Sequence, residues 1–203
     1  MPKKPIHRDR PSRPLRTKAQ QHRDALVRTA IRLFRRQGYA RTGLNEVLRR
    51  SGAPKGSLYH YFPGGKEELG AEAVRVACGS VEQTLLGLEE TCTSPAEFLR
   101  SYLQLLGGWM EASGFRDGCP VATTLLEMAP GVEPIAEAGR CGFEAWTDVM
   151  ARALGSPGES DAARRAKART VIAAVEGALL LARAEGSARP LRDVEATLLR
   201  LLD

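Results

Sequence analysis

Helical periodicity runs through most of the chain and restricts its fold more than any other feature. From Lys66 onward, apolar side chains recur at spacings of three and four residues, and no stretch shows the strict alternation typical of a strand. Proline and glycine interrupt the pattern at intervals. We therefore predict an all-α protein of about nine helices. In this part of the chain, helices are expected over 66–91, over 95–113, from Pro120, over 133–154, over 159–185 and after Pro190.

The N-terminal third differs from the rest of the chain in charge. Residues 1–66 carry 17 of the 30 basic residues and 3 of the 24 acidic residues, a net charge of +14. Residues 67–203 carry 13 basic and 21 acidic residues, a net charge of −8. This asymmetry predicts a nucleic acid or an anionic membrane as partner of the N-terminal third alone. A merely soluble surface would mix both signs along the chain.

Residues 1–16 form a basic segment with four prolines and few apolar side chains. This composition is typical of a disordered arm. Two interpretations are open: the arginines of the arm follow the minor groove of DNA, or the arm is a solvated tail that adds only nonspecific affinity.

Three helical segments follow the arm. The first begins after Thr17 and is expected to end at Gly38, with a cationic outer face. Two short segments come next, joined by a glycine-containing turn at 51–52. Thr42 is expected to cap the first of them, and Pro54 to open the second. The pattern predicts a helix-turn-helix DNA-binding domain over residues 17–65, followed by a helical domain over residues 66–203.

The second short segment divides into two faces. Leu58 and Phe62 are four residues apart, so we expect both to anchor the segment in the core. The opposite face is small and polar at its start and aromatic further on, as suits a recognition helix that enters the major groove by its N-terminus. There Lys55 can donate to guanine, Gly56 permits close approach of the backbone, and Tyr59 can contact a thymine methyl group or a phosphate.

Residues 22–74 resemble the DNA-binding domain of the tetracycline-repressor (TetR) family of bacterial transcription regulators. FRRQGY at 34–39, GSLYHYF at 56–62 and KEEL at 66–69 occur together in the order typical of that family. The resemblance implies base contacts from Lys55, Gly56 and Ser57, and phosphate or mixed contacts from Thr42, Tyr59, His60, Tyr61 and Lys66. GCPVATTLLEMA at 118–129 is similar to the LmrA/YxaF-type subgroup, whose members are often repressors of exporter or detoxification genes.

Polar groups are interleaved with aromatic and apolar ones in the C-terminal helices, a mixture that small-molecule pockets use. By resemblance, this region would bind a small apolar or aromatic effector. Its binding would alter the spacing of the two DNA-binding domains in a dimer. The candidate effector-binding residues are Trp109, Thr123, Glu127, Phe143, Trp146 and Glu176. The two glutamates would neutralise a cationic ligand. The alternatives are an exposed or ion-paired glutamate and aromatic residues that simply form the core.

The last two predicted helices carry more apolar surface than one chain hides easily. In the TetR family, the corresponding helices pair with their symmetry mates in a four-helix bundle, so the resemblance implies a twofold homodimer that reads a palindromic operator. The candidate interface residues are Ala173, Gly177, Leu180, Leu181, Leu191, Val194 and Leu198.

Motifs for catalysis and metal binding are not found in the sequence. It contains no HExxH, no GxSxG and no glycine-rich phosphate loop, and its four cysteines fit no metal-ligand spacing. We therefore predict no catalytic residue, metal site or cofactor. No apolar run approaches the roughly 18 to 20 residues of a membrane-spanning helix, and the N-terminus lacks the apolar segment of a signal peptide. These features favour a cytoplasmic protein with free thiols.

Cys119 precedes Pro120 at a predicted helix N-terminus, where the helix dipole would lower the pKa of the thiol. Redox sensing is therefore one interpretation of Cys119, and a small packing residue is the other.

These observations together predict a homodimeric, ligand-responsive transcriptional repressor. Two rivals remain at this point: a helical small-molecule carrier or enzyme with a basic end, and an effector-independent or activating regulator.

Overall fold

The computed structural model describes residues 17–200 and Leu202, and every regular element in this part of the chain is a helix. The all-helical prediction is therefore confirmed. The helices are α1 (Lys18–Gln37), α2 (Leu44–Ser51), α3 (Ser57–Tyr61), α4 (Gly65–Thr91), α5 (Pro95–Ala112), α6 (Pro120–Met128), α7 (Glu133–Leu154), α8 (Asp161–Glu185) and α9 (Arg189–Leu199). The basic arm predicted over residues 1–16 lies outside the described residues.

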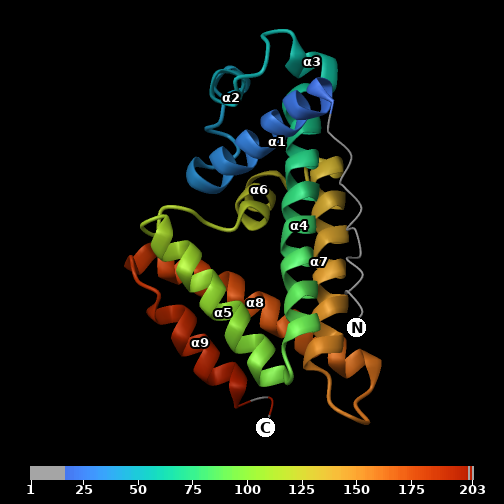
Figure 1. The fold of residues 1–203 in the computed structure, drawn as a ribbon, viewed down its shortest axis with the longest axis vertical. Coiled ribbons are helices and arrows are strands. Elements are labelled where there is room, and N and C mark those ends of the chain that lie inside the picture. The colour runs from blue at the N-terminus through green and yellow to red at the C-terminus, as the bar shows by residue number, and fades with distance from the viewer. Residues whose placement is uncertain (1–16, 201, 203) are drawn as a thin grey trace, which may run out of the picture.

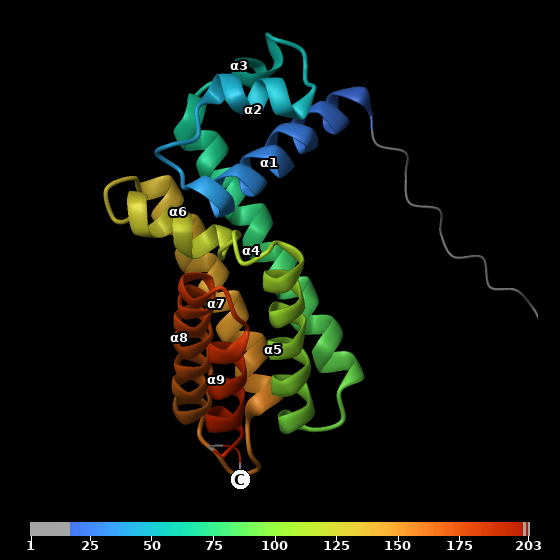
Figure 2. The same ribbon diagram turned by 90° about the vertical axis from the view of Figure 1, so that its left-hand side faces the viewer.

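The molecule is elongated, and α1, α2 and α3 form a head at one end (Figure 1). Helix α4 starts in the head and runs the length of the body, side by side with α7. Helices α5, α8 and α9 form the far part of the body, and α6 lies between them and the head (Figure 2). Helices α4 and α6 therefore both connect the head to the rest of the molecule.

Apolar faces of α1 and α3 form the core of the head. Leu26, Leu33 and Phe34 of α1 are buried together with Leu58 and Phe62, which confirms the predicted anchoring role of the last two. Thr17 caps the start of α1 through a reciprocal capping box with Gln20.

The glycines predicted to end α1 and α2 do so. Gly38 follows α1 with a φ of 87°, and Gly52 follows α2 in the left-handed conformation. The predicted caps of the two short helices are wrong. Gly43, not Thr42, is the N-cap of α2, and α3 begins at Ser57 rather than at Pro54.

Helices α4 and α7 approach closely because small residues lie at their contact. Gly142 of α7 lies against Cys78 of α4, where a side chain would collide with the Cys78 thiol. One turn further along α7, the indole of Trp146 is buried and donates a hydrogen bond to the Cys78 carbonyl over 2.9 Å. Helices α4 and α7 are therefore closely packed against each other along the body.

Candidate DNA-binding surface and ligand pocket

The turn before α3 presents two of the predicted base-contacting residues to solvent. Lys55 and Gly56 are exposed there. Ser57 is different, because it is buried and its hydroxyl donates to the Pro54 carbonyl over 2.7 Å. Its backbone N–H binds the same carbonyl. Ser57 therefore closes the turn and is not available to read a base in this conformation.

The aromatic run that follows is exposed in part. The Tyr59 side chain projects from α3 and its residue is 64% exposed. His60 is exposed as well, and its ring packs edge-on against that of Tyr61 with 4.8 Å between centroids. Tyr61 is half-buried against the core. Tyr59 and His60 thus offer hydrogen-bonding groups beside Lys55 and Gly56.

Two residues predicted to contact phosphate hold the turn between α1 and α2. Thr42 is only 1% exposed, and its hydroxyl donates to the Gly38 carbonyl over 2.7 Å. The Lys66 ammonium group donates to the Ala40 carbonyl over 3.2 Å and lies 4.4 Å from the centre of the Tyr39 ring. Burial lowers the pKa of Lys66. The Thr42 side chain is buried, so the prediction of a phosphate contact is corrected there. The hydrogen bond of Lys66 is exposed and uses one of three N–H donors, so its phosphate contact stays a prediction.

Sequence reasoning missed a basic hollow between α1 and α2. Arg28, Arg32 and Arg50 line it. Arg50 is paired with Glu46 over 2.9 Å, whereas Arg32 donates to the Thr29 hydroxyl. The helical spacing of Arg28 and Arg32 could have shown that they share a face. Only the packing of α2 on α1 brings Arg50 to them.

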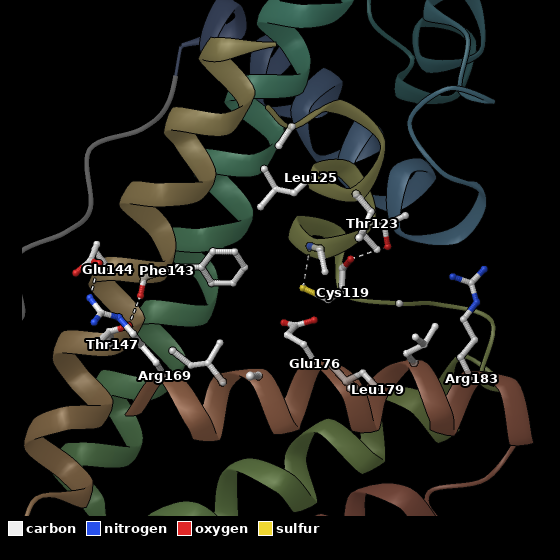
Figure 3. Close-up of a pocket in the computed structure, with 18 residues that line it drawn as sticks. Cys119, Thr123, Leu125, Phe143, Glu144, Thr147, Arg169, Glu176, Leu179 and Arg183 are labelled. Atoms are coloured by element: carbon white, nitrogen blue, oxygen red, sulfur yellow. Dashed lines mark hydrogen bonds and ion pairs between the residues drawn. The ribbon is translucent and has the colours of Figure 1, made fainter. Parts of the chain in front are cut away.

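A cavity of about 730 Å³ lies among α6, α7 and α8 (Figure 3). Its wall is mostly apolar, with Leu125, Phe143, Ile172 and Leu179 among its lining residues. The volume and the apolar wall are those of a site for a small organic ligand.

The structure places three of the six predicted effector-binding residues at the cavity and three elsewhere. Thr123, Phe143 and Glu176 line the cavity. Trp109 lies on α5, outside the wall, and is 44% exposed. Trp146 points to α4, as described above, and belongs to the core. The prediction of both tryptophans is therefore wrong, because helical periodicity did not reveal that Trp109 is partly exposed to solvent and that Trp146 faces α4.

Glu127 of α6 does not line the cavity, and its prediction as an effector ligand is also wrong. Its carboxylate accepts hydrogen bonds from the backbone N–H of Tyr39 over 2.9 Å and of Ala40 over 2.6 Å. Both groups lie in the turn between α1 and α2, which Thr42 and Lys66 also hold. Helix α6 therefore forms part of the cavity wall and binds the head.

Three further contacts join the same parts of the molecule. Gly118, just before α6, donates its N–H to the Arg35 carbonyl over 3.0 Å. The Arg35 guanidinium pairs with Asp117 over 3.1 Å. Arg183 of α8, which lines the cavity, donates to the Arg36 carbonyl over 3.2 Å. The last turn of α1 is thus held by α8 and by the segment that leads into α6.

Ionisable groups inside the cavity have perturbed acidities. Burial raises the pKa of the Glu176 carboxyl. Burial, with the nearby Glu176 carboxylate, raises the pKa of the Cys119 thiol well above its usual value. The expected lowering of that pKa by the α6 dipole is wrong because desolvation outweighs it. The physical argument for redox sensing at Cys119 therefore no longer holds.

Helix α8 carries exposed apolar residues, and one of them, Leu180, also lines the cavity. Leu180 is 67% exposed and Leu181 is 53% exposed. Ala173 and Gly177 belong to the same helix and, like Leu180, line the cavity. Leu191 and Leu198 of α9 are buried within the protomer, and Val194 is half-buried. Leu191 and Leu198 were therefore wrongly predicted as interface residues.

No group of three or more His, Cys, Asp or Glu side chains able to hold a metal ion occurs within residues 17–200. Among the helices that the structure describes, none combines the length and apolar character needed to cross a membrane.

Comparison with known proteins identifies the family. Residues 26–73 match the bacterial regulatory proteins of the tetR family, and residues 95–197 match the C-terminal domain of LmrA/YxaF-like transcriptional regulators. The chain belongs to the TetR family. Regulators of this family bind DNA and dimerise. This TetR-family chain is thus a DNA-binding transcriptional regulator and not an enzyme.

Two curated relatives come from Bacillus subtilis. The HTH-type transcriptional regulator LmrA is 35% identical over 89% of this chain and 96% of its own length. The uncharacterized HTH-type transcriptional regulator YxaF is 33% identical over 83% of this chain and 88% of its own length. The similarity to both covers the head and most of the body, which agrees with the LmrA/YxaF-like subgroup expected from residues 118–129.

Solved structures show the same architecture. Regulatory protein TetR from Rhodobacter sphaeroides superposes with a TM-score of 0.79 and 25% identity, over 87% of this chain and 96% of that chain. A TetR-family regulator from Agrobacterium tumefaciens superposes with a TM-score of 0.77 and 25% identity, over 90% of this chain and 98% of that chain.

Proposed function

We propose that this TetR-family regulator is a homodimeric repressor that a small-molecule effector releases from a palindromic operator. The observation that carries the proposal is the double role of α6, which lines the cavity and binds the head through Glu127. A ligand that displaces α6 must alter these hydrogen bonds. We accordingly divide the chain into a DNA-reading domain over residues 17–65 and an effector-binding and dimerisation domain over residues 66–203.

Four exposed residues make up the proposed DNA contact. Lys55 and Gly56 approach the bases from the turn before α3, and Tyr59 and His60 bind the groove edge or flanking phosphates. Their exposure and the positive charge of the head support this assignment. Thr42 and Ser57 have a different task, since they fix the turns that hold α2 and α3 in place.

The regulatory mechanism is a shift between two populations. DNA favours one position of the head relative to the body, and the effector favours another. Each ligand then weakens the binding of the other by the same coupling free energy, typically about 1 to 3 kcal/mol. Contacts of α8 and of the segment around α6 with the end of α1 supply the physical connection, because the same two helices form the cavity wall.

Dimerisation uses the exposed residues of α8, three of which also line the cavity: Ala173, Gly177 and Leu180. Leu180 and Leu181 expose apolar surface there, and the small residues Ala173 and Gly177 permit close approach of a second helix. A twofold axis beside α8 would place the two copies of α3 on one side of the dimer, about 34 to 36 Å apart or somewhat wider. Such a dimer acts in the cytoplasm, where it reaches bacterial DNA.

The likeness to LmrA/YxaF-type regulators and the apolar cavity support a proposal for the class of target genes. We propose an exporter or detoxification operon, because the products of such genes remove small apolar compounds of the kind that fits the cavity.

Selection of bound sites from random duplex DNA, followed by a ligand screen for release, tests the proposal. We expect an operator with twofold symmetry and at least one apolar compound that lowers the affinity of the protein for it. An operator without twofold symmetry would contradict the dimer. Chemical turnover of a bound compound would favour the carrier or enzyme, and DNA binding that no ligand alters would favour the effector-independent regulator.

A further inference from the structure

One polar side chain of the cavity stands apart from the others. Glu176 lies on the cavity face of α8, and its carboxyl group points into the cavity toward Cys119 of α6 (Figure 3). The Cys119 thiol is the one hydrogen-bonding partner that the structure gives this carboxyl group among the described residues. A thiol is a weak donor, so a carboxylate at this position has poor compensation for the loss of water.

The other polar side chains of the wall already have partners within the protein. The hydroxyl of Thr123 donates to the Cys119 carbonyl over 2.8 Å, and that of Thr147 donates to the Phe143 carbonyl over 2.7 Å. Arg169 is paired with Glu144 over 2.9 Å. Arg183 donates to the Arg36 carbonyl of the head. The hydroxyl protons of both threonines and the charge of Arg169 are thus already used within the protein, whereas the Glu176 carboxylate has no charged partner among the described residues.

The ionisable groups around Glu176 on other helices offer it no positive charge. Cys119 lies at the start of α6, Tyr102 belongs to α5 and Cys78 to α4, and the Glu176 carboxylate disfavours ionisation of all three. Arg169 and Arg183 lie seven residues away in either direction on α8 itself, about 10 Å along the helix axis. The carboxylate of Glu176 therefore lacks a counterion among the described residues.

We propose that the effector is an apolar molecule that carries a protonated amine, and that Glu176 is its counterion. The amine donates to the carboxylate, and the apolar body fills the space between Leu125, Phe143 and Leu179. The cavity volume of about 730 Å³ fits a molecule of drug size. Phe143 adds an aromatic ring to the wall, and the face of such a ring attracts cations. This inference rests on the proposed function, because it assumes that the cavity is the effector site.

Three probes with one ring system test the chemical class: 1-naphthylmethylamine, 1-naphthalenemethanol and 1-naphthoic acid. Isothermal titration calorimetry at pH 7.5 on the full-length protein measures the affinity of each. We expect the amine to bind about tenfold or more tightly than the alcohol, and the acid to bind most weakly. In the Glu176→Gln variant, the preference of the amine over the alcohol should fall to less than about twofold.

Glu144→Gln is the matched control, because Glu144 also lines the cavity but is already paired with Arg169. This variant should keep the preference for the amine. Circular dichroism and thermal unfolding of both variants establish that the fold is retained, and amide for carboxyl is a change of little volume at either position.

The outcomes separate the two hypotheses. Equal affinity of the wild-type protein for amine and alcohol would overturn the role of Glu176 and leave the proposed function standing. A selective affinity for the amine that does not release operator DNA would support the ligand class and contradict the proposed effector function. Absence of binding by all three probes would overturn both the ligand class and the assignment of the cavity.

Discussion

Tyr59 combines high exposure with a position on the recognition helix. Its hydroxyl group forms no hydrogen bond within the described part of the chain, and its ring does not belong to the core. Replacing this residue therefore changes what the head presents to DNA with little effect on how the head folds. Leu58 and Phe62 on the opposite face carry the packing.

Tyr59→Phe should lower operator affinity about five- to tenfold, since one hydrogen bond to the DNA contributes about 1 to 1.5 kcal/mol. Tyr59→Ala should lower it further, because this substitution removes the ring as well as the hydroxyl group. Fluorescence anisotropy with labelled operator measures both effects. Thermal unfolding should be unchanged, and wild-type affinity in both variants would remove Tyr59 from the DNA-binding surface.

Glu176 has a cost for the stability of the unliganded protein. Burial raises its pKa in the folded state, so the folded state holds the proton to higher pH than the unfolded state does. Below the pKa that Glu176 has in the unfolded chain, the carboxyl group is neutral in both states and the stability of its neutral form is fully present. That stability is lost as the pH rises through the pKa that Glu176 has in the folded protein. We therefore expect Glu176→Gln to raise the melting temperature at pH 7.5, by a difference that shrinks as the pH falls toward the usual glutamate pKa. A difference that grows on acidification would contradict this sign.

At the scale of elements, glycine and proline located the breaks between most of the long helices. The starts of the two short helices could not be predicted in this way, because their turns are closed by side chains that bond backward. Thr42 donates to Gly38 and so does not cap α2, and Ser57 binds the Pro54 carbonyl and so delays the start of α3. A sequence shows that such residues can hydrogen-bond locally, but not in which direction they do so.

The residues that line the cavity could be predicted only in part, because the sequence does not show which neighbour each side chain of a helix faces. Spacing shows which residues share a face of a helix, yet a helix in the body has several neighbours. Phe143 and Trp146 are three residues apart on α7, and their rings are in edge-to-face contact, but one lines the cavity and the other binds α4. The link from Glu127 to Tyr39 spans 88 residues of sequence and leaves no local signal.

Helix α6 should transmit ligand binding through Glu127. In Glu127→Gln, one amide oxygen replaces two carboxylate oxygens, so the hydrogen bonds to Tyr39 and Ala40 cannot both be kept at full strength. We expect the ratio of operator affinities without and with effector to fall about three- to tenfold, while effector affinity in the absence of DNA changes little. Calorimetry and operator anisotropy on the same variant measure the two quantities. An unchanged ratio would contradict the role of α6.

At the scale of the whole molecule, the exposed leucines of α8 predict the oligomeric state. Leu181→Glu should convert the dimer to a monomer at micromolar concentration, because the charge would be buried unpaired between two copies. Sedimentation velocity measures the change. Val76→Glu on α4 is the control, since Val76 is an exposed apolar residue of another helix. A dimer that persists in Leu181→Glu would place the interface elsewhere.

The basic N-terminal segment is tested by deletion. Removal of residues 1–16 should weaken operator binding and flatten its dependence on salt, by about 0.9 in the log–log slope for each phosphate that the segment neutralises. Operator affinity measured at several salt concentrations gives the slope. A slope equal to that of the full chain would exclude the minor-groove interpretation and leave the solvated tail.

The connection between head and body has a consequence for how such regulators diversify. Glu127, Gly118 and Arg183 all bind main-chain groups of the head, whereas the pair of Arg35 with Asp117 depends on a head side chain. Substitutions that change the bases recognised by α3 therefore leave most of the connection intact. A chimaera that carries the head of a relative with the same α1–α2 turn should respond to the same compound at a different promoter. The fold therefore permits effector recognition and operator recognition to evolve independently.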